Sequence, residues 1–314
     1  MKSPLPCPLI AVFLAACIFC PLPVRAWDYT GHMLIDEIAY ENVKPEVRAR
    51  VAELAAKLES RYNNNVPYNF VTAGCYMDDT RAEPGYAYGK WHYIDINYTA
   101  DGSGYAEPQP PHVVWAIEQA RETLLKADAT DGQKAEALAM LMHFTGDVHQ
   151  PLHCVNWNND QGGGGYIIAG VPFTDVSKKQ VPNLHLFWDR AYRYDAKDGK
   201  ILELYNGLWT IERPAVPAQG VIKNEAAKIM ADYPASAFAE LLKTDDPHEW
   251  ARESYVLACK SAYPPGPYPQ DFEAVKLSPE YVHQAHDIAC RRVALAGYRL
   301  ADLLNKLLAA PGAQ

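Results

Sequence analysis

The strongest constraint on the fold is a series of amphipathic runs, each with a helix-initiating residue in front of it. After Pro45, apolar residues recur at spacings of three and four up to residue 58, which places them on one face of an α-helix. Similar runs follow Pro111, Asp131, Asp246-Pro247 and Ser278-Pro279. An Asp or Ser side chain caps the first N–H groups of a helix, and proline fits its first turn. The sequence therefore predicts an all-α fold.

Strand patterns are scarce. The tripeptide Tyr166-Ile167-Ile168, after four glycines, is the best candidate for a short β-ribbon. No stretch has the composition of a flexible interdomain linker, and hydrophobic residues make up 49% of the 314 positions, enough for one large core. We therefore expect a single helical domain over residues 27–314.

The first 26 residues have the features of a secretory signal peptide. Lys2 precedes an apolar stretch, residues 9–20, that is too short to span a membrane, and the segment ends on the small residue Ala26. Cleavage there would make Trp27 the N-terminus of a secreted or periplasmic protein. The alternative is a lipoprotein box, Leu14-Ala15-Ala16-Cys17, with a lipid on Cys17. We favour the signal peptide, because the motifs described below give Trp27 itself a role.

Four cysteines remain after such a cleavage, namely Cys75, Cys154, Cys259 and Cys290. An even number in an exported chain permits up to two disulfides, among three possible pairings. We expect Cys259–Cys290 first, since both residues lie in strongly helical C-terminal segments.

The chain is acidic, with a formal net charge of −9 from 29 basic and 38 acidic residues. A protein with this balance does not hold a polyanion in a basic groove, as many nucleic-acid-binding proteins do. If it acts on a polyanion, a group other than Lys and Arg must supply the positive field.

The most informative segment for function runs from His143 to His153. His143 and Asp147 are four residues apart and therefore share one helix face. Pro151 would end this helix and let His153 turn back beside the same end. Taken alone, a His–Asp pair is a weak indication of a metal site, because such pairs also form on protein surfaces.

The same spacing occurs at His283 and Asp287, where no further ligand-rich motif is nearby. We expect this second pair, with His286, to be structural or solvated. The first pair is accompanied by further possible ligands, in segments that contain Trp27 and His32, Asp78, His92, and His185 with Asp189. Imidazoles together with carboxylates suit zinc, whose catalytic sites use nitrogen and oxygen ligands.

Three of these motifs together resemble the S1/P1 zinc-dependent nucleases. They are Trp27-x4-His32 at the mature N-terminus, His143-Phe-x-Gly-Asp-x-x-Gln-Pro-Leu-His153, and Asn183-Leu-His-x-x-Trp-Asp189. The similarity extends over most of residues 27–310. It implies an all-helical domain of the phospholipase C/P1 nuclease type, with three zinc ions.

The resemblance also divides nine ligands among the three ions. One zinc would be held by Asp78, His92, His143 and Asp147. A second would be held by the α-amine and carbonyl of Trp27, by His32 and by the shared Asp147. The third would be held by His153, His185 and Asp189.

Such a cluster would give an acidic protein a cationic centre for phosphate. Two zinc ions that share Asp147 can hold a bridging hydroxide, which would attack phosphorus in line while the remaining zinc neutralises the departing 3′-oxygen. Asp147 and Asp78 are therefore catalytic candidates, together with Arg81, which stands where the family has a basic residue and could clamp phosphate oxygens. The alternative for Arg81 is a surface salt bridge with Asp78 or Asp79.

Tyr93 and Asp95 match the family positions that hold the nucleobase, by stacking and by hydrogen bonding to the base edge. Stacking requires an unstacked base and so favours single strands. Tyr93 has the alternative of a packed core ring, and Asp95 that of an acceptor that orients a ligand histidine. The Gly-Gly-Asn motif of the family is absent, since four glycines precede Tyr166 here, and this leaves the base preference open.

The expected function is hydrolysis of single-stranded DNA and RNA to 5′-phosphate products, and of 3′-mononucleotides, by a monomer without a stable protein partner. One alternative is a zinc phospholipase C, in which the last ligand motif ends in Glu and the first His lies further from the N-terminal Trp. Asp189 and the short gap from Trp27 to His32 favour the nuclease. The other alternative is a lipid-anchored zinc-binding protein without enzymatic activity, which would need Cys17 as its N-terminus.

Overall fold

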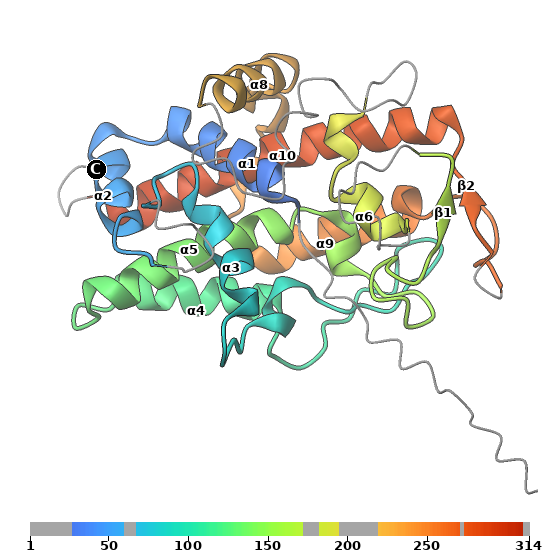
Figure 1. Ribbon diagram of the computed structural model, residues 1–314, viewed down its shortest axis with the longest axis horizontal. Coiled ribbons are helices and arrows are strands. Elements are labelled where there is room, and N and C mark those ends of the chain that lie inside the picture. Colours follow the sequence, from blue (N-terminus) through green and yellow to red (C-terminus); the bar gives the residue numbers. More distant parts are fainter. Residues whose placement is uncertain (1–26, 60–66, 172–181, 195–218, 271–272, 310–314) are drawn as a thin grey trace, which may run out of the picture.

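Helices dominate the computed structural model, which describes residues 27–59, 67–171, 182–194, 219–270 and 273–309 (Figure 1). The predicted all-α fold is confirmed. The predicted signal peptide and the alternative lipid site at Cys17 lie outside the described residues. Within the described ranges, no helix combines the length and the apolar composition needed to cross a membrane.

The longest helix, α10 (Pro279–Leu308), runs along the whole molecule and packs against α1 (Tyr29–Asn42) (Figure 1). Ser278 caps its start by accepting a hydrogen bond from the N–H of Tyr281. The two helices approach closely at Gly297, where a Cβ atom would come within 2.5 Å of Ile38 Cγ2. Helix α8 (Gln219–Asp232) covers the outer side of α1 and α10.

Helices α4 (Val113–Leu125) and α5 (Asp131–Asp147) lie side by side on the opposite side of this pair (Figure 1). Helix α5 begins with a capping box, in which the Thr130 side chain accepts from the N–H of Gln133 and the Gln133 side chain accepts from the N–H of Thr130. All of its residues from Ala137 to Asp147 are buried. The last turns of α5 therefore bring polar side chains into the centre of the fold.

Shorter elements complete the described structure. The remaining α-helices are α2 (Pro45–Ala55), α3 (Tyr76–Asp79), α6 (Leu184–Trp188) and α9 (Pro247–Leu257). The 3-10 turns are η2 (Ala73–Cys75), η3 (Thr80–Ala82), η4 (Gly89–His92), η5 (Pro151–Cys154), η6 (Ala191–Arg193), η7 (Ala235–Phe238) and η8 (Leu241–Lys243), and η9 (Ala258–Ala262) is a π-helical turn. The predicted β-ribbon forms as β1 (Ile168–Ala169), which pairs in parallel with β2 (Val275–Lys276).

The predicted disulfides are not formed among the described residues, which include all four cysteines of the predicted mature chain. Cys290 Sγ lies 3.8 Å from the carbonyl oxygen of Tyr192, to which it donates. Cys259 lies instead on η9, beside Tyr255. The Cys259–Cys290 prediction was therefore wrong, because a helical setting for both residues does not bring their sulfur atoms together.

Candidate metal centre

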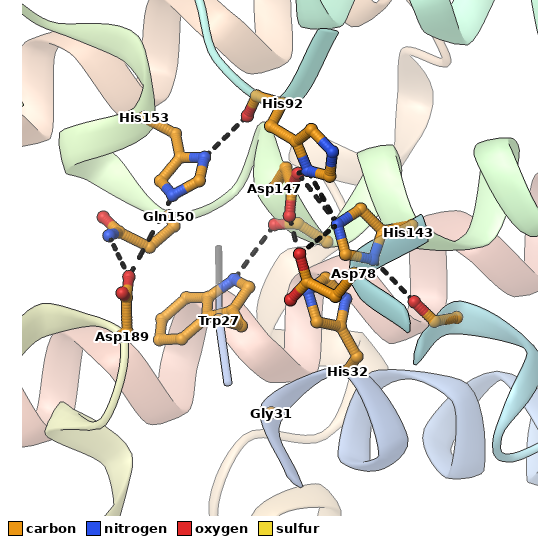
Figure 2. Close-up of polar contacts among 12 residues, drawn as sticks. Trp27, Gly31, His32, Asp78, His92, His143, Asp147, Gln150, His153 and Asp189 are labelled. Atoms are coloured by element: carbon orange, nitrogen blue, oxygen red, sulfur yellow. Dashed lines mark hydrogen bonds and ion pairs between the residues drawn. The ribbon is translucent and has the colours of Figure 1, made fainter. Parts of the chain in front are cut away.

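Buried His and Asp side chains gather around the C-terminal end of α5 in three groups (Figure 2). In each group, one possible ligand atom per residue lies within 4.8 Å of the others. The groups are His32, His143 and Asp147; Asp78, His92 and His143; and His153, His185 and Asp189. The structure thus brings together every ligand side chain that the sequence analysis assigned to metal.

Helix α5 itself contributes two side chains to this arrangement. His143 and Asp147 lie one helical turn apart, and His143 Nε2 is 3.2 Å from Asp147 Oδ2. His92, on η4, places Nδ1 at 3.0 Å from the same oxygen and at 2.9 Å from His143 Nε2. Asp78, on α3, lies slightly further away, with Oδ1 at 4.0 Å from His143 Nε2.

The second oxygen of Asp147 faces a different group. His32, on α1, stacks on His143 with ring centroids 4.0 Å apart, and its Nε2 lies 3.4 Å from Asp147 Oδ1. One carboxylate therefore presents Oδ2 to His92 and His143, and Oδ1 to His32. Asp147 could therefore contribute one oxygen to each of two neighbouring metal sites.

The third group lies on the other side of Asp147 (Figure 2). Pro151 opens η5 after the end of α5, as predicted, and this turn carries His153. His153 Nε2 is 3.2 Å from His185 Nε2, which is in turn 3.5 Å from Asp189 Oδ1. His185 and Asp189 lie one turn apart because α6 is helical.

Trp27 lies between these groups and is completely buried (Figure 2). Its indole Nε1 donates to the carbonyl oxygen of Gly146 over 2.9 Å, and the N–H of Asp28 donates to the carbonyl oxygen of Asp189 over 3.3 Å. The Asp28 side chain forms a buried ion pair with Arg193. The beginning of the predicted mature chain is therefore fixed between the groups, and the sequence analysis had no signal for the Asp28–Arg193 pair.

Main-chain carbonyls orient three of the imidazoles. His143 Nδ1 donates to the carbonyl oxygen of Gly74 over 2.6 Å, His153 Nδ1 to that of His92 over 2.6 Å, and His185 Nδ1 to that of Gly162 over 2.8 Å. Because a carbonyl only accepts, each Nδ1 carries the hydrogen and each Nε2 keeps its lone pair for a metal. Sequence analysis missed these partners, since carbonyls leave no side-chain signal.

Two of the three carbonyls belong to glycines that have no room for a side chain. A Cβ atom at Gly74 would lie 2.5 Å from Asp36 Oδ2, and one at Gly162 would lie 2.1 Å from the carbonyl oxygen of Leu152. Gly162 also has a φ of +62°, in the region that favours glycine.

The unpaired polar atoms of the centre fit a bound cation. Among the described residues, neither ring nitrogen of His32 has a hydrogen-bond partner, and neither has Asp147 Oδ1 or Asp189 Oδ2. Leaving such atoms buried and unpaired is costly, and a metal ion would supply the missing partner. Donor atoms bound to one tetrahedral zinc at roughly 2.0–2.1 Å lie about 3.3 Å apart, close to most of the separations here.

The pKa shifts of two of the histidines also suit a metal centre. Burial lowers the pKa of His32 and of His92 well below the ordinary value, which favours the neutral imidazole that a metal needs. Burial raises the pKa of Asp147 to about 6, although the neighbouring His143 opposes this. A cation at this centre would therefore bind best above that pH.

We expect zinc to raise the melting temperature much more at pH 7.5 than at pH 5. A carboxyl with a raised pKa stabilises the metal-free fold below its unfolded pKa, and this contribution is lost as pH rises through about 6. The metal-bound form needs the same carboxylate deprotonated, so the gain from zinc grows with pH. Thermal melts of zinc-loaded and chelated protein at both pH values measure this rise in melting temperature. An equal rise at pH 5 and pH 7.5 would contradict the assignment of Asp147 as a metal ligand.

Arg81 lies at the edge of the centre with its side chain 13% exposed, and its Nε is 2.9 Å from Asp78 Oδ1. Burial works against the charged form of this guanidinium, but Asp78 and Tyr86 raise its pKa. The ion pair that was the alternative for Arg81 therefore exists, but it is buried at the centre rather than on the surface.

Tyr93 and Asp95 lie on one side of an extended segment that follows η4. Ile94 and Ile96, which alternate with them, are completely buried, while Tyr93 is half-buried and Asp95 is exposed. Tyr93 is thus not a core ring. His143, His153 and His185 already donate to main-chain carbonyls, so Asp95 is not the acceptor that orients these three histidines. Their proposed contact with a nucleobase stays a prediction.

The comparison pair behaves as expected for a surface contact. His283 Nε2 is 3.5 Å from Asp287 Oδ2, and both side chains are about half exposed, at 53% and 51%. His–Asp spacing alone therefore does not make a metal site in this chain. Burial and converging motifs distinguish the centre at α5.

Comparison with known proteins gives the family. The S1/P1 Nuclease family model matches residues 27–309. The chain is 27% identical to Endonuclease 1 of Arabidopsis thaliana, over 95% of this chain and 92% of that protein. It is 24% identical to Nuclease P1 of Penicillium citrinum, over 90% and 97%, and 24% identical to Nuclease S1 of Aspergillus oryzae, over 91% and 93%. The chain therefore belongs to the S1/P1 nuclease family and is an endonuclease of the S1/P1 type.

Proposed function

We propose that this protein is an exported, zinc-dependent phosphodiesterase that hydrolyses single-stranded DNA and RNA to 5′-phosphate products and also removes phosphate from 3′-mononucleotides. The observation that carries the proposal is Asp147, whose two carboxylate oxygens face separate ligand groups. The names of the relatives support nucleic acid as the substrate.

Three zinc ions would account for the ligand atoms of the centre. Asp78, His92, His143 and Asp147 would hold the first, and His153, His185 and Asp189 the third. His32 and Asp147 would hold the second together with Trp27, whose α-amine becomes available only if the chain is cleaved after Ala26. When bound, zinc supplies Lewis acidity that activates water as a nucleophile near neutral pH and neutralises a departing 3′-oxygen.

The side chains around the ligands would bind and orient the substrate. Arg81 would hold two oxygens of the phosphate, with its guanidinium fixed by Asp78 through the contact at 2.9 Å. Tyr93 would stack on an unpaired base, and Asp95 would accept a hydrogen bond from its edge. Because a base inside a duplex is already stacked, this arrangement favours single strands.

Hydrolysis of matched substrates by zinc-loaded protein tests the proposal. We expect cleavage of single-stranded DNA and RNA to be much faster than that of the duplex, with 5′-phosphate ends on the products. Phosphatidylcholine hydrolysis without cleavage of nucleic acid would favour the phospholipase C alternative. An intact mass of the exported protein that includes a lipid on Cys17 would favour the anchored alternative.

We expect Tyr93→Ala to weaken the binding of single-stranded substrate by about 1–3 kcal/mol, the usual contribution of one base–aromatic stack. The zinc content should not change, because Tyr93 is half-buried and provides no ligand atom. Binding titrations with a noncleavable oligonucleotide and elemental analysis measure the two effects. Loss of zinc in step with binding would show that Tyr93 supports the fold instead.

A further inference from the structure

His92 differs from the other ligand histidines in the nitrogen that it presents to the centre. The three imidazoles oriented by carbonyls present Nε2, whereas His92 presents Nδ1, at 2.9 Å from His143 Nε2. Its outer nitrogen, Nε2, lies 2.6 Å from the hydroxyl of Tyr86. The orienting partner of His92 is therefore a side chain.

The chemistry of this contact fixes which atom donates. If Nδ1 binds a metal, the neutral ring carries its hydrogen on Nε2 and donates it to the Tyr86 oxygen. The same hydroxyl forms a hydrogen bond with Arg81, whose guanidinium has only donors. Tyr86 therefore receives hydrogen bonds from a metal ligand and from the proposed phosphate-binding cation.

The local backbone explains how Tyr86 reaches both groups. Arg81 lies on η3, and the chain then reverses in a turn in which the N–H of Tyr86 donates to the carbonyl oxygen of Glu83 over 3.2 Å. The turn contains Pro84 and Gly85, and Gly85 has a φ of +86°. No atom lies within 4 Å of a Cβ built at Gly85, so the backbone angle alone favours glycine there.

We propose that Tyr86 is a positioning residue that couples the metal ligand His92 to Arg81. Its hydroxyl fixes the tautomer and the ring orientation of His92, and it holds the guanidinium beside Asp78. The coupling to Arg81 rests on the proposed function, whereas the effect on His92 concerns metal affinity alone.

Tyr86→Phe tests this proposal, because it removes the hydroxyl and keeps the ring. Tyr88→Phe is the matched control. Tyr88 packs edge-to-face against Tyr86 with centroids 5.3 Å apart, but its hydroxyl donates to Glu136, outside the centre. The measurements are zinc affinity in competition with a chelator, melting temperature of the metal-free protein, and kcat and KM on a single-stranded oligonucleotide.

We expect Tyr86→Phe to weaken the affinity for one zinc by about 10–100-fold, the usual effect of losing such an orienting partner. The kcat should fall more than the KM changes, while Tyr88→Phe matches the wild type. Wild-type affinity and kcat in Tyr86→Phe would overturn the proposal, as would equal losses in both variants. Failure of the wild-type protein itself to bind zinc or to cleave nucleic acid would refute the proposed function instead.

Discussion

Asp147→Asn should lower the turnover of single-stranded DNA by about 10²–10³-fold, the scale on which one essential electrostatic group acts. Asn keeps the shape of the side chain but has one acceptor oxygen and no charge. Since the two oxygens of Asp147 face separate groups, the substitution disturbs both groups and the space between them. The measurements are kcat with saturating zinc and zinc content by elemental analysis.

Two further variants make this result specific. His153→Ala removes a ligand from the third group only, and we expect added zinc to restore more of its activity than that of Asp147→Asn. Asp287→Asn changes the same residue type at the same spacing from a histidine, but on the surface, and should be silent. Turnover close to wild type in Asp147→Asn would refute the bridging role.

A protein that begins at Ala26 instead of Trp27 should bind fewer zinc ions and should be nearly inactive. With Ala26 attached, the nitrogen of Trp27 belongs to a peptide bond, its lone pair is delocalised, and it does not bind zinc at neutral pH. The fold should survive, because the contact from Trp27 to Gly146 and the Asp28–Arg193 pair do not need a free amine. Zinc stoichiometry and nuclease rate for the two forms measure the effect.

Trp27→Phe in the form that begins at residue 27 separates the amine from the ring. This variant keeps the α-amine but loses the indole hydrogen bond to Gly146 and part of the buried ring that contacts Tyr192. We expect it to keep the zinc stoichiometry of the wild type at some loss of melting temperature. Full activity of the form that begins at Ala26 would remove Trp27 from the ligand set and would favour a mature chain that begins at Cys17.

Local patterns in the sequence were enough to predict the parts of the centre that depend on helix geometry. As the sequence indicated, His143 and Asp147 lie one turn apart near the end of α5, and the turn that Pro151 opens carries His153. Helix α1, which carries His32, has no amphipathic pattern, because every residue from Thr30 to Ala39 is buried. An element that is covered on all sides does not show the periodicity on which helix prediction depends.

Features that depend on long-range contacts were missed or wrong. The Cys259–Cys290 prediction came from the helical setting of both residues, which carries no information on where their sulfur atoms lie. The contact between Tyr86 and His92 joins a side chain after the turn at Pro84-Gly85 to the metal centre, and no motif in the sequence pairs these two residues. Both features depend on the tertiary structure, which local sequence patterns do not specify.

The carbonyls that hold His143 and His185 have a consequence for how this protein tolerates mutation. Replacing another side chain leaves both backbone acceptors in place, whereas even alanine at Gly74 or Gly162 adds a Cβ atom. A larger residue at either position would clash with Asp36 or with the carbonyl oxygen of Leu152, and would displace the carbonyl that orients His143 or His185. In a saturation library, substitutions of these two glycines should be depleted as strongly as substitutions of the histidines that they orient.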